Sequence, residues 1–293
     1  MIEKYFVVKD HIGQDWKASY IVCPVCESTN YKEFFRLVKT RCRPQRPAGT
    51  FVKCAHCGLV YINPRILFPV HASEEYSEES SEDIDFHANM RLLDYELGED
   101  MERVRIFKPT GRLLEIGSGT GAFLSLSSNS GYRAVGIEPP KNYAEYARHR
   151  FVVDVIEGLV GGRRQSTELP RDEFDVVVML AVIEHVLDVQ KVIQNVHKLL
   201  RGGGVFYLMT PDVNSLYAHI HGLRWNHYHV CWHHQFLGKH TLRRLLSDNG
   251  FRILKTWGVY RGRQSYWRRI TKSIFSTIGV SLDVIAVLAE KTK

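Results

Sequence analysis

The sequence predicts an α/β fold, in which a mostly parallel sheet with a closing antiparallel strand and helices on both faces follows a small cysteine-bearing module. Two observations lead to this prediction. From residue 109 onward, short apolar runs alternate with stretches of helical spacing, which is the order of elements in a parallel α/β sheet. Before residue 66, two C-x2-C pairs are separated by 27 residues.

The composition is that of a folded globular protein. Of the 293 residues, 44% are hydrophobic and 24% are charged, which is ordinary for this class. The longest apolar run, residues 176–183, is far shorter than the roughly 20 residues that a membrane helix needs. The N-terminus has no apolar segment of the kind found in secretory signal peptides, so we expect a cytoplasmic protein.

Seven strands and four helices are expected in the large domain, residues 109–293. The strands cover residues 112–116, 132–137, 151–156, 174–180, 205–209, 251–259 and 282–289. The helices cover residues 122–129, 139–149, 188–200 and 239–249, and the third is expected to stop at the glycine run 202–204. Residues 174–180 are apolar throughout, as in a strand that is buried on both faces.

Charge divides the chain into three segments. Residues 1–66 carry a net charge of +6, residues 67–108 of −8 and residues 109–293 of +9. The acidic segment indicates a solvated linker with a covering helix at residues 85–107, or alternatively a lid over a site. The basic excess elsewhere favours anionic partners such as phosphorylated metabolites, nucleic acid or lipid head groups.

Four of the six cysteines form the two C-x2-C pairs: Cys23, Cys26, Cys54 and Cys57. Each pair places two thiolates on one tight turn, and two such turns make the tetrahedral four-sulfur site that zinc accepts. Disulfides or unrelated thiols are the alternatives, and the absence of a secretory signal disfavours disulfides. We therefore expect residues 1–66 to form a zinc ribbon with a closed, structural ion, because so small a core needs the metal to fold.

A glycine-rich loop follows the first strand of the large domain. Gly117, Gly119 and Gly121 let the backbone turn and approach a ligand, and the next helix points its first amides at that ligand. Glu138, at the end of the second strand, can accept both hydroxyls of a ribose. The pattern fits either NAD or S-adenosylmethionine. Glu115 favours S-adenosylmethionine, because a carboxylate there would repel a diphosphate and attract a cationic amino-acid end.

Five motifs in order resemble those of class I S-adenosylmethionine-dependent methyltransferases, a family with a Rossmann-like sheet. They are residues 113–121, 136–138, 174–177, 183–186 and 200–204. The end of the ribbon, residues 57–65, narrows the resemblance to bacterial methyltransferases with an N-terminal zinc ribbon. These include sugar C-methyltransferases and enzymes of surface-polysaccharide gene clusters.

The resemblance implies how the donor would be bound. Glu115 would hold the amino-acid end, and Glu138 would hold the ribose hydroxyls. The residues that would line the donor and contact its adenine are Gly117, Ser118, Gly119 and Gly121 in the glycine loop, then Gly158 and Leu159 after the third strand.

Histidines cluster in the connection after the fifth strand, where seven of the fourteen lie between residues 219 and 240. Residues 231–236 resemble the stretch in which related sugar methyltransferases carry a Tyr-x-Glu-His base group. His234 matches the histidine of that group and is the expected base, whereas His233 replaces the glutamate. His185 is the second candidate base, or else a packed histidine. Three aromatic residues in the connection offer flat surfaces for a ring-shaped acceptor: Trp225, Tyr228 and Trp232. A second metal site among the loop histidines is an alternative.

A basic, amphipathic segment lies near the C-terminus. In residues 261–278, apolar side chains recur every four residues beside a basic face. This pattern is typical of an ordinary packed helix. The alternative is a helix that lies on a membrane surface and makes peripheral contact there.

We expect the chain to transfer a methyl group from S-adenosylmethionine to a sugar or nucleotide-linked sugar, by in-line displacement with a histidine base. The ribbon would help to form the acceptor site. The alternative is an RNA methyltransferase that binds nucleic acid through the ribbon and the basic segments. A non-catalytic binding module and an NAD enzyme are the remaining alternatives.

Overall fold

The computed structural model describes residues 6–9, 15–37, 49–67, 95–160, 169–230, 233–260 and 281–292. Several features of the sequence therefore lie outside the described residues. These are most of the acidic segment, the two remaining cysteines, one aromatic residue and the amphipathic stretch: residues 68–94, Cys42, Cys231, Trp232 and residues 261–278. No helix in the described ranges is long and apolar enough to cross a membrane.

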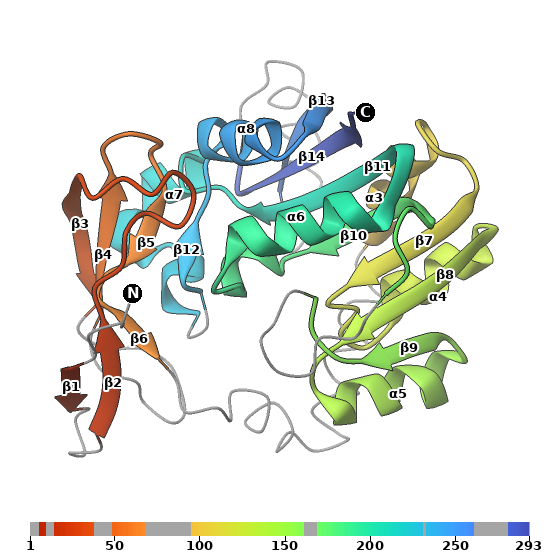
Figure 1. Ribbon diagram of the computed structural model, residues 1–293, viewed down its shortest axis with the longest axis horizontal. Coiled ribbons are helices and arrows are strands. Elements are labelled where there is room, and N and C mark those ends of the chain that lie inside the picture. Colours follow the sequence, from red (N-terminus) through yellow and green to blue (C-terminus); the bar gives the residue numbers. More distant parts are fainter. Residues whose placement is uncertain are drawn as a thin grey trace.

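A sheet of seven strands forms the centre of the larger domain (Figure 1), in the order β13-β14-β11-β10-β7-β8-β9. Strands β7 to β11 pair in parallel, and β14 is antiparallel to both of its neighbours. The strands are β7 Gly111–Ile116, β8 Tyr132–Glu138, β9 Asp154–Glu157, β10 Phe174–Leu180, β11 Leu200–Pro211, β13 Phe251–Val259 and β14 Val284–Lys291. The expected mostly parallel sheet with an antiparallel closing strand is confirmed.

The largest differences from the sequence prediction are at the first residues of two strands, β11 and β9. Strand β11 begins at Leu200 and runs through the glycine run, because Leu200 pairs with Phe174 across a register shift in β10. A Cβ on Gly204 would lie 3.1 Å from the Phe174 carbonyl oxygen, so this bulged stretch of strand needs glycine there. Strand β9 begins three residues later than expected, because the preceding helix continues to Phe151.

Helices cover both faces of the large sheet. Alternate strand residues face opposite sides: Leu113 packs in a cluster with helices α3 and α4, whereas Leu114 packs in a cluster with α6 and α8. Helix α5 packs beside α4 at the β9 edge. The helices are α3 Tyr95–Arg105, α4 Ala122–Asn129, α5 Lys141–Phe151, α6 Val189–Leu199, α7 Leu216–His221 and α8 Lys239–Asp248, with short 3-10 turns η1 Ile183–His185, η2 Gly222–Arg224 and η3 Asn226–His229.

The N-terminal module, which we define as the described residues between 6 and 67, provides all but one of the strands of two small antiparallel sheets. One has the order β1-β2-β6 and the other β12-β5-β4-β3. Strand β12 comes from the far end of the chain, beside the orange β5 in Figure 1, and pairs with β5. The strands are β1 Phe6–Lys9, β2 Asp15–Ser19, β3 Tyr31–Leu37, β4 Gly49–Cys54, β5 Val60–Ile62, β6 Arg65–Leu67 and β12 Gln235–Phe236. The module and the large domain therefore share a sheet.

An aromatic cluster fills the joint between the module and the large domain. The Phe236 ring is fully buried and lies 5.5 Å from the Phe51 ring and 5.0 Å from the Tyr228 ring, centroid to centroid. Trp225 is 3% exposed and Tyr228 is 4% exposed in this cluster. The expectation that these two side chains offer flat surfaces to an acceptor is therefore wrong, because they form core.

We predict that Phe236→Ala lowers the free energy of unfolding by about 3–5 kcal/mol, because it removes a buried ring and leaves a cavity at the joint. The matched control is Phe34→Ala in the same small sheet, where the ring is 41% exposed and a loss of less than about 1 kcal/mol is expected. Urea denaturation of both variants measures the difference. Equal losses would contradict the assignment of Phe236 to a shared core.

Candidate functional site

The glycine loop lies between β7 and α4, and its backbone conformation requires glycine. Gly117, Gly119 and Gly121 have φ values of 72°, 52° and 83°, a region that residues with a Cβ adopt at a cost. A Cβ on Gly117 would lie 2.5 Å from Val182 Cγ2, in the loop that follows β10. The glycine loop therefore packs directly against the segment that leads into the 3-10 turn η1.

Glu138 ties the end of β8 to the glycine loop. Its Oε2 atom accepts a hydrogen bond of 2.6 Å from the Gly119 backbone N–H, and the side chain is buried. The Glu138 backbone carbonyl accepts a second hydrogen bond, 3.1 Å long, from the Gly158 N–H. The predicted donor residues at the ends of β7, β8 and β9 therefore meet at one edge, and Leu159, which follows Gly158, is 43% exposed there.

Two hydroxyl groups of the glycine loop are buried. Ser118 and Thr120 are each 2% exposed, and their side-chain oxygens have no hydrogen-bond partner among the described residues. A buried hydroxyl without a partner is costly, and a polar ligand held by this loop would supply one. Glu115 is also buried, at the end of β7. Sequence reasoning did not select Thr120, because a threonine in such a loop carries no pattern of its own.

A buried carboxylate lies at the end of the neighbouring strand. Glu184, in η1, is 1% exposed, and its Oε2 accepts a hydrogen bond of 3.0 Å from the Thr210 hydroxyl. Its Oε1 lies 3.9 Å from His233 Nε2. Burial raises the pKa of Glu184 to about 7, and burial together with the neighbouring His185 and His227 lowers the pKa of His233 well below its usual value.

Two of the three predicted histidines, His185 and His233, lie beside this carboxylate, and His234 contacts Glu184 through its backbone. The His185 and His233 rings lie 4.7 Å apart, nearly edge to face. The His234 backbone N–H donates a hydrogen bond of 2.8 Å to the Glu184 carbonyl. Glu184 lies within the motif at residues 183–186, but the motif alone indicates no role for it. Its adjacency to His185 was the one available signal, because its contact with His233 exists only in the folded chain.

Residues of the N-terminal module and of β12 hold the loop that follows β10. The Gln235 side-chain amide donates hydrogen bonds to the Ile183 and Val186 carbonyls, at 2.8 and 2.7 Å. The Arg65 guanidinium donates to the Leu187 carbonyl at 2.5 Å. The position of η1, and therefore of Glu184, depends on contacts from both parts of the molecule.

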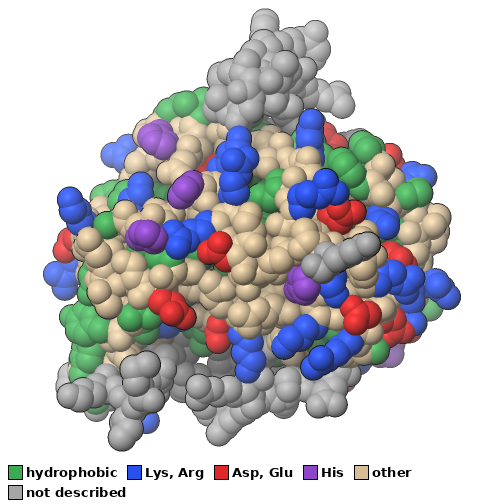
Figure 2. Space-filling view, turned by 45° about the horizontal axis from the view of Figure 1, so that its top comes forward, with side chains coloured by type: hydrophobic (Ala, Val, Ile, Leu, Met, Phe, Trp, Pro, Cys, Tyr) green, Lys and Arg blue, Asp and Glu red, His purple; other side chains and the backbone are tan. Residues whose placement is uncertain are grey.

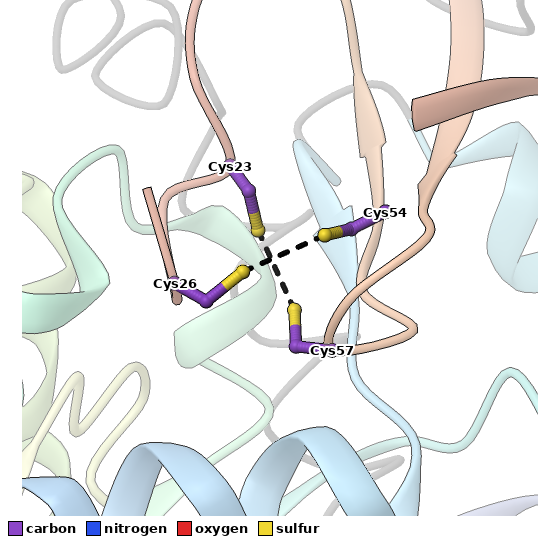
Figure 3. A group of neighbouring side chains, drawn as sticks. All are labelled: Cys23, Cys26, Cys54 and Cys57. Carbon is purple, nitrogen blue, oxygen red and sulfur yellow. Dashed lines mark hydrogen bonds between the residues drawn. The ribbon is translucent and has the colours of Figure 1, made fainter. Parts of the chain in front are cut away.

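The four cysteines of the two C-x2-C pairs face one another (Figure 3). Their sulfur atoms all lie within 4.8 Å of one another, with separations of 3.5 Å for Cys23–Cys57 and for Cys26–Cys54. A tetrahedral zinc ion with Zn–S bonds of about 2.3 Å needs sulfur–sulfur separations of about 3.8 Å, so this donor set fits the ion. Burial raises the pKa of Cys54, but hydrogen bonds from backbone N–H groups and from Cys26 and Cys23 lower it to about 7. The hydrogen bond to Cys57 and burial raise the pKa of Cys23, and burial raises the pKa of Cys26 to about 11.

The cysteine cluster also contacts the large domain. The Thr241 hydroxyl of α8 donates a hydrogen bond of 2.8 Å to the Cys57 carbonyl. The Gln190 side-chain amide of α6 donates a hydrogen bond of 2.6 Å to the Val25 carbonyl. Both pairs of cysteines are thus fixed to helices of the same face of the sheet.

Comparison with known proteins gives one family. A family model described as a methyltransferase domain matches residues 86–256. The C-methyltransferase NovU of Streptomyces niveus is 27% identical over 146 residues, which are 48% of this chain and 33% of that protein. The mitochondrial ubiquinone biosynthesis O-methyltransferase of Mus musculus is 28% identical over 170 residues, which cover 53% of this chain and 45% of that protein. The chain thus spans between about a third and about half of the length of these two relatives.

A solved structure shares the fold. The S-adenosylmethionine-dependent methyltransferase of Mesorhizobium loti superposes with a TM-score of 0.51 and 17% identity, covering 67% of this chain and 100% of that one. At that identity the likeness concerns the fold alone. The part of the chain left uncovered is of the size of the N-terminal module together with the acidic segment.

We predict that Cys54→Ser abolishes binding of one zinc ion per chain and lowers the unfolding midpoint by about 5 °C or more, because metal binding is coupled to the folding of a small module. The matched control is His56→Ala, an exposed residue between the two cysteines of the second pair, which should keep the ion. Metal content of the purified protein and thermal unfolding check both variants. Full zinc content in Cys54→Ser would contradict a four-thiolate site.

Proposed function

Because this chain belongs to the methyltransferase-domain family, whose model matches residues 86–256, we propose that it transfers a methyl group from S-adenosylmethionine to a small-molecule acceptor. One observation carries the proposal. The glycine loop is pinned to Glu138 by the Gly119 N–H, and it holds the buried hydroxyls of Ser118 and Thr120 without partners among the residues described. A loop of this kind is built to receive a polar ligand at the carboxyl ends of parallel strands.

The residues of this loop suit the parts of the donor. The Glu138 carboxylate accepts more than one hydrogen bond, so it would bind the ribose hydroxyls while keeping its bond to the Gly119 N–H. Glu115 would attract the cationic amino-acid end, and Gly158 and Leu159 would contact the adenine. The donor supplies an activated methyl group, so the protein has to align the two reactants and exclude water.

We propose a sugar or a nucleotide-linked sugar as the acceptor. His185, His233 and His234 are the candidate bases, and the buried Glu184 carboxylate lies beside two of them, His185 and His233. The relative NovU is named a C-methyltransferase, which supports methyl transfer as the reaction. A zinc ion on the four cysteines would be structural, since thiolates fill all of its positions, and a cytoplasmic setting would keep those thiols reduced.

An RNA acceptor is the second candidate, and the net charge of +7 favours it. On the face drawn in Figure 2, the basic side chains are spread out and interspersed with acidic ones rather than gathered into one basic surface. Tight RNA binding needs many phosphate contacts from one surface. A small acceptor is our first choice, ahead of RNA and of a peripheral membrane contact through residues 261–278.

The direct test is methyl transfer from donor labelled in the methyl group to pooled sugar nucleotides and, separately, to total RNA. We expect label in the sugar-nucleotide pool alone, because the candidate bases lie in a buried site. Label in RNA alone would overturn the acceptor class. Absence of S-adenosylhomocysteine binding by calorimetry would overturn the proposed activity itself.

We predict that Gly117→Ala weakens S-adenosylhomocysteine binding at least tenfold, because the new methyl group would clash with Val182 and move the glycine loop. The matched control is Gly131→Ala. Gly131 also has a positive φ, 92°, but a Cβ there meets nothing within 4 Å, so the backbone strain is similar and the site is untouched. Calorimetry on both folded variants measures the affinities, and equal affinities would refute this role of the loop.

A further inference from the structure

Two hydrogen-bond acceptors face each other in the buried cluster at the end of β10. The His233 Nδ1 atom lies 2.9 Å from the His227 carbonyl oxygen. A carbonyl only accepts, so Nδ1 carries the hydrogen, and in the neutral ring Nε2 carries a lone pair. That lone pair faces Glu184 Oε1 at 3.9 Å. Oε1 is buried and has no hydrogen-bond partner in the described part of the chain.

The contact between Glu184 Oε1 and His233 Nε2 is favourable only when one of the two atoms carries a proton. With Glu184 ionised and His233 neutral, a negative oxygen and a nitrogen lone pair would be buried against each other, which is unfavourable in a medium of low dielectric constant. One proton, carried on either atom, turns the contact into a charge-assisted or neutral hydrogen bond after a small approach. The arrangement therefore selects a state with one shared proton.

The surroundings contribute few other charges. Thr210 of β11 donates its hydroxyl to the other carboxylate oxygen, Oε2, at 3.0 Å. His185 lies edge-on to His233, and His227 of η3 stacks on it with ring centroids 5.9 Å apart. His227 Nε2 is in turn 3.5 Å from Asp283 Oδ2, just before β14. His234 contributes its backbone N–H to the Glu184 carbonyl. Glu184 is thus the one carboxylate in contact with His233 among the described residues.

We propose that Glu184 is the positioning residue of the methyltransferase base: it shares one proton with His233, so that the two act as a single proton acceptor. This rests on the proposed function. The two residues come from different segments, Glu184 from the turn η1 and His233 from the stretch before β12, and the fold brings them within 3.9 Å of each other.

The pair takes up the proton that the acceptor loses. In the reaction, the bond between the methyl carbon and the donor sulfur breaks, and its electrons stay on sulfur as a neutral thioether. The new bond to the methyl carbon uses the electron pair of the acceptor's X–H bond, where X is the methylated atom. The released proton is taken up by the pair as a whole and is shared between Glu184 Oε1 and His233 Nε2, since His233 Nδ1 already bonds to the His227 carbonyl.

The pH dependence follows from the need for an ionised carboxylate. Burial raises the pKa of Glu184 to about 7, so the fraction of the pair that is ready to accept a proton rises with pH through that value. The Thr210 hydrogen bond stabilises the carboxylate and lowers this pKa. Removing that bond therefore moves the midpoint to higher pH.

The test uses the full-length, zinc-loaded protein and the variants Glu184→Gln and Thr210→Val. Ring-nitrogen NMR of His233 between pH 5 and pH 9 should show a coupled titration in the wild type. We expect its midpoint to fall by at least one pH unit in Glu184→Gln, since the anionic partner of the imidazolium is lost, and the midpoint of the pair to rise in Thr210→Val. The matched control is Glu173→Gln, just before β10. It should leave the titration midpoint of His233 and that of the pair unchanged.

The activity arm compares pH–rate profiles. We expect Glu184→Gln to lose at least tenfold in kcat with its rise through pH 7 abolished, while S-adenosylhomocysteine affinity and the unfolding midpoint change little. An unchanged His233 titration in Glu184→Gln would overturn the proposal. So would a wild-type activity that requires added Mg²⁺ or Mn²⁺ bound at Glu184, since the pair would then be an ion site. Failure to bind S-adenosylhomocysteine would overturn the proposed function, while the NMR titration still decides on the pair.

Discussion

The positions of Glu184, His233 and His234 depend on the backbone pairing of β12 with β5. Residues 233 and 234 immediately precede β12, and the Ile62 N–H of β5 donates to the His234 carbonyl at 3.0 Å. The same short strand presents Gln235 to two carbonyls of the loop that carries Glu184. Strand β5 follows closely on the cysteine pair that ends at Cys57, so the four-cysteine cluster lies next to this pairing.

The large sheet and the glycine loop could be predicted from the sequence because their patterns are local. An apolar run such as residues 174–180, followed by helical spacing, marks a buried parallel strand wherever it occurs. A loop that needs positive φ at Gly117, Gly119 and Gly121 can be recognised in the sequence by these glycines. The cysteine pairs likewise came together as their spacing indicated.

The features that escaped prediction depend on segments that are distant in the chain. Strand β12 has two residues and no pattern of its own, so only its partner in the N-terminal module defines it. The contact between Glu184 and His233 likewise forms only when two segments that are distant in the sequence fold together. The prediction that Trp225 offers a surface to the acceptor is wrong. An aromatic ring can be a stacking surface or part of a core, and only its packing with Phe51 and Phe236 in the folded chain decides between the two.

The shared small sheet also sets an order of events during synthesis. Strand β5 ends at residue 62 and β12 begins at residue 235, so at 5–20 residues per second the ribosome delivers the second roughly 10–35 seconds after the first. In that interval the nascent chain exposes an unpaired strand edge, which is a template for aggregation. Early capture of a metal ion by the cysteines would keep the half-built sheet in register until its last strand emerges.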